Sequence, residues 1–217
     1  MYPNNVLNIT ENFEAPDLVN KFSRALGESV ENTRKGLKSV VPTLITGMIS
    51  RTKSETGPAT LLNIVNKDGI DASRVENFDD ENIILMGSDA VDGIFGNNLD
   101  NVALNLEKNV GIKSANIKKM MGMAAPVLMG IIARKVRREN LNSEALAGYL
   151  TGQNETFTTE APDGVIGDVA GVTNSVYEEP YKTDSDHIEN SPWFVILMLG
   201  ILLLSVIWWY TGSSFNT

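Results

Sequence analysis

Side chains that could carry out acid–base or metal chemistry are few in this sequence. The single histidine, His187, lies beside Asp184 and Asp186 in an acidic stretch, where we interpret it as an exposed spacer residue rather than a metal ligand or general base. No cysteine is present, which removes thiolate nucleophiles, disulfides and cysteine-type zinc sites. No glycine-rich phosphate loop and no nucleophile–base pair is found either. The sequence therefore predicts no catalytic residue, no cofactor and no metal site.

One acidic group in the middle of the chain suggests calcium at first sight. It consists of Asp79, Asp80 and Glu81, followed by Asp89 and Asp92. Its spacing does not follow the loop of an EF-hand, and acidic residues are common at helix starts. We therefore interpret these residues as helix-start acids and reject a metal.

The strongest basic cluster is Arg134, Lys135, Arg137 and Arg138. One interpretation is that it complements the negative end of a helix dipole and keeps the surface soluble. The functional alternative is contact with anionic lipid or with a partner. Binding of nucleic acid is not expected, because no aromatic stacking stripe accompanies the cluster.

Apolar side chains recur at helical spacing from Pro16 to about residue 150. We therefore expect helices to position the acidic group and the basic cluster. A short helix from Pro16 ends at Gly27, and Ser29 caps a longer one that runs to about Ser50. Further helical segments are predicted from Pro58, over 79–86 and over 99–110, with a brief turn capped by Ser88 between the last two of these. Ser114 is predicted to cap the longest helix, which runs to about Asn140. Pro42 and Pro126 lie inside the two long helices and should kink them; the first should kink near Lys38 or break into two.

The sequence repeats at an offset of 84 residues. Without a gap, Gly27 falls on Gly111, Asn32 on Asn116, Pro42 on Pro126 and Leu44 on Leu128. We interpret this as a duplicated unit, over about 15–66 and 99–150, with two copies packed face to face. Asn32 and Asn116, read as interior polar residues, are the only hint of a site between the units. The interpretation we prefer is that they bond to backbone groups at the starts of their helices.

The paired pattern GESVENTRKGLKSVVPTLITG and GIKSANIKKMMGMAAPVLMG resembles the bacterial YidB-like family known as domain of unknown function 937. The resemblance covers about residues 18–150 and depends chiefly on AAPVLMGIIAR. It implies an all-helical bacterial domain without established enzymatic activity. Some members also carry a membrane span and then a peptidoglycan-binding OmpA-like domain. Because this sequence stops at Thr217, we expect either a tail-anchored member without that last domain or a shortened copy of a longer protein.

Residues 151–192 are predicted to be an acidic, flexible tether, and 1–14 a loose leader. Charge is uneven: residues 1–150 carry 17 basic and 18 acidic residues, whereas 151–217 carry one basic and nine acidic residues. The net charge of −9 therefore belongs mainly to the C-terminal part. Whether 163–176 docks on the domain is left open.

Residues 193–210 form a run of 18 uncharged residues, WFVILMLGILLLSVIWWY. As a helix it would be about 27 Å long, close to the hydrocarbon thickness of a bilayer. Aromatic rings at both ends suit the two headgroup levels. We predict a single transmembrane helix, represented by Trp193, Phe194, Leu199, Leu203, Trp208, Trp209 and Tyr210, and a short tail over 211–217.

Together these patterns predict an all-α fold, in which a pseudo-duplicated helical domain with proline-kinked helices is followed by one C-terminal transmembrane helix. We expect a non-enzymatic adaptor or scaffold in the bacterial inner membrane, with its N-terminal domain cytoplasmic and bound to an unidentified protein partner. The alternatives are a hydrolase-like enzyme with a carboxylate site between the repeat units, or the inner-membrane half of a peptidoglycan-linking protein. Self-association of the chain is left open.

Overall fold

Helices account for nearly all of the residues that the structure, a computed structural model, describes: 13–67 and 81–152. No strand occurs in these ranges, so the all-α prediction is confirmed for this part of the chain. In chain order the elements are α2 (Pro16–Leu26), α3 (Val30–Arg51), α4 (Gly57–Asn66), α5 (Glu81–Phe95), the 3₁₀ turn η3 (Gly96–Asn98), α6 (Leu99–Val110), α7 (Ser114–Glu139) and α8 (Ser143–Thr151).

Local signals set several helix ends as predicted. Gly27 ends α2 and Gly111 ends α6, both in the left-handed conformation, with φ of 67° and 79°. A side chain at either position would be strained, because L-residues other than glycine rarely adopt this conformation. Ser29 caps α3, and its Oγ accepts a hydrogen bond of 3.1 Å from the backbone N–H of Asn32.

The prediction that a turn capped by Ser88 follows the helical segment 79–86 was wrong. Instead of a short segment followed by a turn capped at Ser88, one helix, α5, runs from Glu81 to Phe95. Ser88 lies inside it, and its hydroxyl donates to the carbonyl of Ile84 at 3.0 Å. Gly87 and Ser88 resemble turn residues locally, but their small size lets α5 approach α7 closely, and that packing favours the helix.

The predicted cap of α7 was also wrong. Ser114 is the first residue of α7, and its backbone N–H donates to Oε2 of Glu107 in α6 at 2.8 Å. A carboxylate from a neighbouring helix therefore takes the place of a serine cap. The prolines do not break their helices, since α3 continues through Pro42 and α7 through Pro126. The predicted break of α3 is thus excluded, and the kinks stay a prediction.

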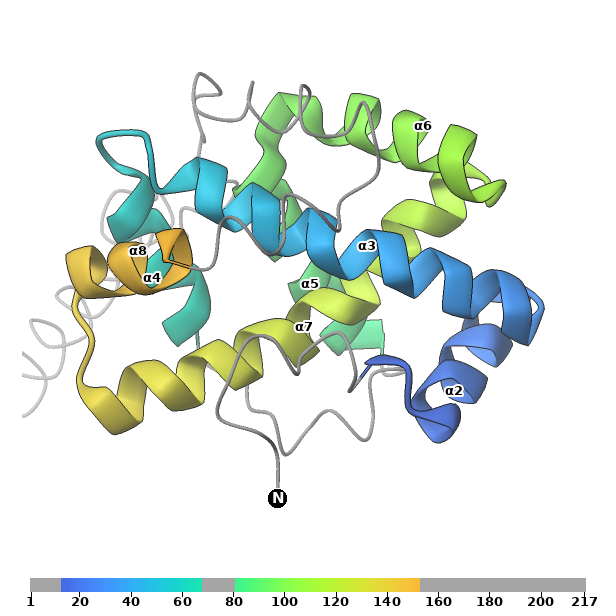
Figure 1. Ribbon diagram of the computed structural model, residues 1–217, viewed down its shortest axis with the longest axis horizontal. Helices are drawn as coiled ribbons and strands as arrows, with labels where there is room; N and C mark the ends of the chain where they lie inside the picture. The colour runs from blue at the N-terminus through green and yellow to red at the C-terminus, as the bar shows by residue number, and fades with distance from the viewer. Residues whose placement is uncertain (1–12, 68–80, 153–217) are drawn as a thin grey trace, which may run out of the picture. The chain divides into compact units, whose positions relative to one another are not determined.

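Equivalent helices recur at the 84-residue offset: α2, α3 and α4 correspond to α6, α7 and α8. Their contacts correspond too, because α2 packs on α3 and α7, while α6 packs on α7 and α3. The equivalent helices α3 and α7 contact each other, as do α4 and α8, which lie side by side in Figure 1. Each half therefore buries its apolar faces largely against the other half.

The core is centred on α3 and α7. Met120, Met121, Met123 and Met129 of α7 are completely buried and belong to this core. The helix α5 adds a further layer, and its main contact is with α7. Among the described helices, none combines the length and the apolar character needed to cross a membrane.

The prediction of a loose leader over 1–14 was wrong at its end, because Phe13 is buried in the core against Phe22 and Glu14 forms an ion pair of 3.4 Å with Lys38. Residues 1–12 of that leader, the predicted tether of 151–192 from residue 153 on, the transmembrane run 193–210 and the tail lie outside the described residues, as do His187 and the stretch 163–176.

Candidate functional site

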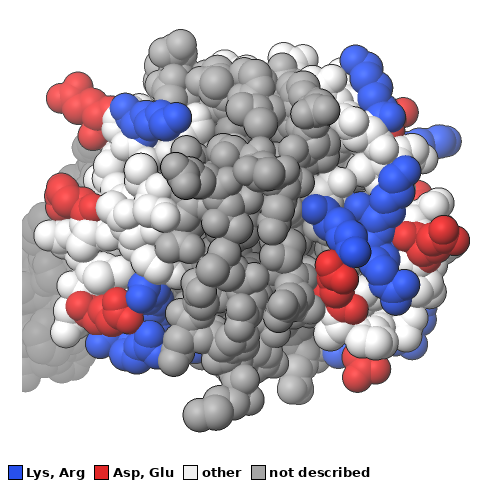
Figure 2. Space-filling view, viewed as in Figure 1, with Lys and Arg blue, Asp and Glu red and all other residues white. Residues whose placement is uncertain are grey.

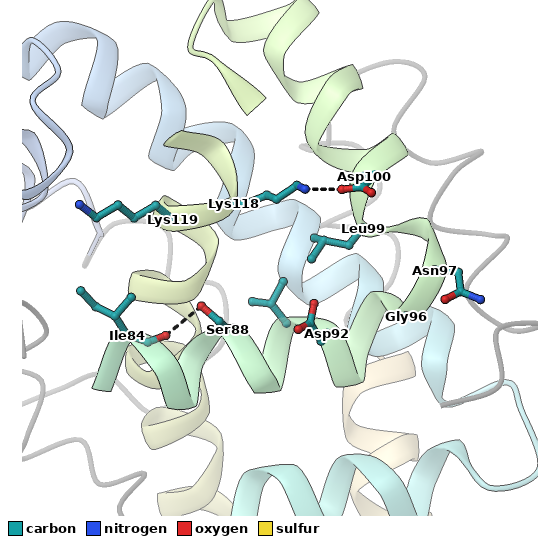
Figure 3. Close-up of a pocket in the computed structure, with 10 residues that line it drawn as sticks. Ile84, Ser88, Asp92, Gly96, Asn97, Leu99, Asp100, Lys118 and Lys119 are labelled. Carbon is teal, nitrogen blue, oxygen red and sulfur yellow. Dashed lines mark hydrogen bonds and ion pairs between the residues drawn. The ribbon is translucent and has the colours of Figure 1, made fainter. Parts of the chain in front are cut away.

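A cleft of about 570 Å³ lies where the C-terminal half of α5 meets η3 and the first turns of α6 and α7 (Figure 3). Four helical or turn elements therefore contribute to one surface. The lining residues are Ile84, Ser88, Val91, Asp92, Gly96, Asn97, Leu99, Asp100, Lys118 and Lys119.

One face of α5 forms a wall of the cleft. Ile84, Ser88, Val91 and Asp92 are spaced i, i+4, i+7 and i+8, which places them on the same side of a helix. Val91 is buried and Ile84 half-buried, whereas Asp92 is exposed at the mouth. The wall thus joins an apolar strip to a single carboxylate.

Both lysines of the cleft already have polar partners. Lys118 forms an ion pair with Asp100 at the start of α6, drawn in Figure 3. Lys119 donates a hydrogen bond of 2.8 Å to the carbonyl of Ala25, at the end of α2. The second contact also supplies a donor to a helix C-terminus, where carbonyls lack partners within the helix.

Asp92 stands apart from these pairs. No described side chain donates a hydrogen bond to its carboxylate. Burial and the nearby charge of Asp89 raise its pKa above the ordinary value, Lys118 opposes this shift, and Asp100 adds to it. Asp89 itself pairs with Lys67 at 3.3 Å. The carboxylate of Asp92 therefore lies in a locally negative environment with an open side toward the cleft.

This arrangement can bind a cation more readily than it can catalyse a reaction. A general base needs a nucleophile or a proton to act on within reach, and the hydroxyl of Ser88, the only one in the described lining, bonds to its own helix. Among the described residues, no three acidic or histidine side chains gather closely enough to hold a metal ion. A carboxylate next to an apolar wall instead suits a lysine or arginine side chain, whose stem is apolar and whose head is charged.

Residues 11–135 match the family model described as bacterial protein of unknown function (DUF937), and this match covers more than half of the 217 residues. The chain belongs to the DUF937 family. The matched range includes all of the described residues that line the cleft, and also the two helix-internal prolines, Pro42 and Pro126. No curated protein and no solved structure matches this DUF937 chain.

The basic cluster predicted from the sequence of this DUF937 protein lies away from the cleft. The basic cluster of Arg134, Lys135, Arg137 and Arg138 is in the last turns of α7, whereas Lys118 is near its start. Lys135 follows Lys118 by 17 positions along α7, which corresponds to about 25 Å of helix. The cluster and the cleft are therefore two separate surfaces.

The asparagines proposed for a site between the repeat units do not form one. Asn32 is exposed, and Asn116 is half-buried, with its Nδ2 donating to Oε1 of Glu28 at 2.8 Å. Reading both as interior polar residues was wrong, because Asn32 lies in the first turn of α3, on its exposed side.

Sequence reasoning also missed the cleft. Asp92 was interpreted as a helix-start acid, which was wrong because it lies near the C-terminal end of α5. Lys118 and Lys119 were not singled out from the sequence. The spacing of Ile84, Ser88, Val91 and Asp92 places them on one face of a helix, and this could have been noticed in the sequence. It becomes visible only when 81–95 is treated as one continuous helix. The pairing of Asp100 with Lys118 joins different helices and had no local signal.

Proposed function

We propose that this DUF937 protein is a non-enzymatic, membrane-tethered adaptor whose helical domain presents the α5–α7 cleft to a protein partner. The observation that carries the proposal is Asp92, a carboxylate at the mouth of the cleft beside an apolar wall and without a bonded donor among the described residues. The 18-residue apolar run at 193–210 supports the tether, and the AAPVLMGIIAR motif supports a YidB-like assignment within the family.

The occupant of the cleft is a segment of the partner that carries a lysine or arginine. Its cationic head would pair with Asp92, and its apolar stem would lie along Val91 and Ile84. The cation would neutralise the carboxylate of Asp92, because the described lysines nearby pair with its neighbours instead: Lys67 with Asp89 and Lys118 with Asp100. A volume of about 570 Å³ is sufficient for a few side chains of a peptide segment.

Site-specific photo-crosslinking in native membranes tests this proposal. With a photoactivatable residue in place of Asn97, which lines the cleft, we expect the full-length protein to form one discrete adduct. Asp92→Asn should reduce this adduct about tenfold, which corresponds to the loss of one hydrogen bond to a charged group, and Asp92→Lys should abolish it. The same probe at Asn63, exposed on α4, is the positional control. An adduct that survives Asp92→Lys would exclude the cleft as the docking site.

Binding of the partner at the cleft should depend on pH through the carboxyl of Asp92. Because the pKa of Asp92 is raised, it becomes neutral at a higher pH than an ordinary aspartate does, and capture should fall from that point as the pH is lowered. The free energy of unfolding should rise as the pH is lowered through this range. The reason is that a pKa raised in the folded state means that the folded domain binds the proton of Asp92 more tightly than the unfolded chain does. Asp92→Asn should therefore stabilise the domain slightly, by less than about 1 kcal/mol because the group is exposed. Thermal unfolding at two pH values checks the sign.

Orientation can be tested separately from binding. We expect the helical domain on the cytoplasmic side and Thr211–Thr217 outside, since a domain made before its first apolar segment is harder to translocate than a short tail. Protease added to intact spheroplasts should leave the domain whole, and protease added after permeabilisation with detergent should digest it. Digestion of the domain in intact spheroplasts would show that it lies outside the cytoplasm and would exclude a cytoplasmic partner.

A further inference from the structure

Lys118 is a single cation placed between two carboxylates of the cleft. Asp92 lies on α5, Asp100 in the first turn of α6 and Lys118 near the start of α7, and all three line the cleft. The ammonium of Lys118 pairs with Asp100, as Figure 3 shows. Burial and the charge of Asp89 raise the pKa of Asp92, but Lys118 is close enough to lower it in part. One ammonium therefore acts on both carboxylates and is bonded to one of them.

Two further lysines near the cleft have other partners. Lys67 pairs with Asp89 at 3.3 Å. Lys119 donates to the carbonyl of Ala25 at 2.8 Å, and in Figure 3 its side chain points away from that of Lys118. Among the described residues, these contacts leave both carboxylates to Lys118.

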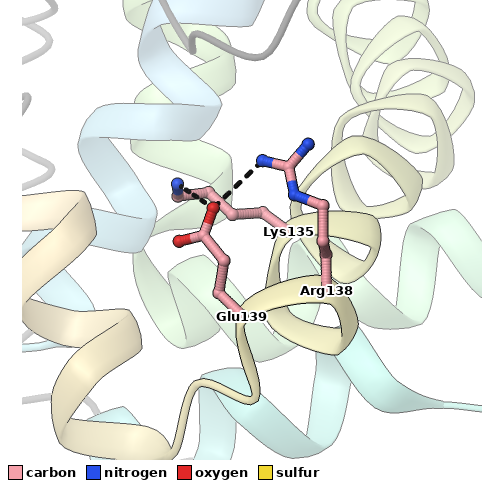
Figure 4. Close-up of polar contacts among 3 residues, drawn as sticks. All are labelled: Lys135, Arg138 and Glu139. Carbon is pink, nitrogen blue, oxygen red and sulfur yellow. Dashed lines mark hydrogen bonds and ion pairs between the residues drawn. The ribbon is translucent and has the colours of Figure 1, made fainter.

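A carboxylate at the other end of α7 shows the effect of bonded cations. Acidic and basic side chains lie next to each other at several places on the face shown in Figure 2. In one such group Glu139 accepts hydrogen bonds of 2.9 Å from Lys135 and 3.0 Å from Arg138 (Figure 4), and these contacts lower the pKa of its carboxyl. Asp92 has no bonded donor among the described residues, because the cation next to it is bonded to Asp100.

We propose that Lys118 is an internal competitor for Asp92, and that Asp100 keeps the cleft open to a partner by holding the ammonium of Lys118. The inference rests on the proposed function, because it describes how the same site is regulated. Lys118 has an apolar stem and a charged head, so it can occupy the cleft in the same way as the side chain expected from the partner. With Lys118 on Asp100 the cleft accepts a partner cation, and with Lys118 on Asp92 it does not.

The ion pair that holds Lys118 is weak enough to exchange. The side chains of Lys118 and Asp100 are 42% and 74% exposed. A pair with this exposure changes an equilibrium by no more than about fivefold. Its loss should move Lys118 onto Asp92 in part of the molecules, and the apparent affinity for the partner should fall with the fraction of open clefts.

Photo-crosslinking from position 97 tests the competition in the full-length protein. Asp100→Asn should reduce the adduct about threefold, because the released Lys118 occupies Asp92. Adding Lys118→Met should restore the adduct to at least its original level, since the competing charge is gone and the apolar stem is kept. Asp17→Asn is the matched control: Asp17 is an exposed acid in the first turn of the equivalent helix α2, does not line the cleft, and should leave the adduct unchanged.

A pH titration of the aspartate carboxyl carbons, followed by NMR on the full-length protein in detergent, measures the exchange without a partner. Asp92→Asn assigns the signal of Asp92. Asp100→Asn should lower the pKa of Asp92 in two ways, by removing a neighbouring negative charge and by releasing Lys118. In a Lys118→Met background only the first effect remains, so the decrease in pKa should be clearly smaller.

The two measurements separate the possible failures. A full adduct in Asp100→Asn, an equal loss in Asp17→Asn, or an adduct that Lys118→Met does not restore overturns the competition and leaves the proposed adaptor intact. Equal decreases in the pKa of Asp92 with and without Lys118 also overturn the competition, because no exchange takes place. The absence of any adduct in the unsubstituted protein overturns the adaptor and the competition together.

Discussion

Gly87→Ala is expected to destabilise the helical domain strongly, because a methyl group at this position would clash with the backbone of α7. A Cβ at Gly87 would lie 1.8 Å from the carbonyl oxygen of Gly122 and 2.8 Å from Cδ of Pro126, so α5 would have to move away from α7. Overpacking typically costs about 1–3 kcal/mol, and a clash with backbone should reach or exceed the upper end of that range.

Thermal unfolding of the full-length protein in detergent, followed by circular dichroism, measures this effect. Gly148→Ala is the matched control, because Gly148 also lies in a helix and a Cβ there meets no atom within 4 Å. It should stabilise the domain by up to about 1 kcal/mol, the difference in helix propensity between alanine and glycine. Equal melting temperatures for the two variants would show that α5 is not held to α7 through this contact.

Gly87→Ala should also impair the cleft. Ser88 and Asp92 line it from α5, and Lys118 and Lys119 line it from α7. Moving the two helices apart would separate these walls, so the crosslink from position 97 should weaken even in molecules that remain folded. The same helix contact therefore supports stability and the geometry of the proposed binding site.

Phe95→Ala should have an effect of similar size by the opposite mechanism. Phe95 is completely buried at the end of α5, and its ring lies against Gly47 of α3. Removing the ring should cost about 3–5 kcal/mol through lost burial and the cavity that remains. The loss would be measured as a decrease in the free energy of unfolding in urea.

A double-mutant cycle shows whether Gly47 is the partner of this ring. In the native protein, a Cβ at Gly47 would lie 2.5 Å from Phe95 Cζ and 2.8 Å from Ile94 Cγ2, so Gly47→Ala alone should destabilise. With Phe95→Ala already present, most of the clash is gone, and Gly47→Ala should cost clearly less. Additive effects would place the ring of Phe95 elsewhere.

The sequence by itself determined most of the helix pattern. Gly27 and Gly111 end their helices in a conformation that favours glycine, and Ser29 caps α3 through a hydrogen bond three residues away. The 84-residue offset between Pro42 and Pro126 also recurs in the order and contacts of the helices. The helix ends depend on residues only a few positions apart, and the repeat is found by comparing two stretches of the same chain. All of this information is present in the sequence itself.

Only the tertiary structure decided how residues 81–95 fold and where the cleft lies. Gly87 and Ser88 carry a local signal for a turn, yet α5 is continuous because close packing against Gly122 of α7 favours small residues in a helix. Likewise Glu107 replaces the cap expected at Ser114, and Lys118 pairs with Asp100 from a different helix. Such contacts join residues that are distant in the chain, and their free energy arises only when the helices have packed, so no local pattern encodes them.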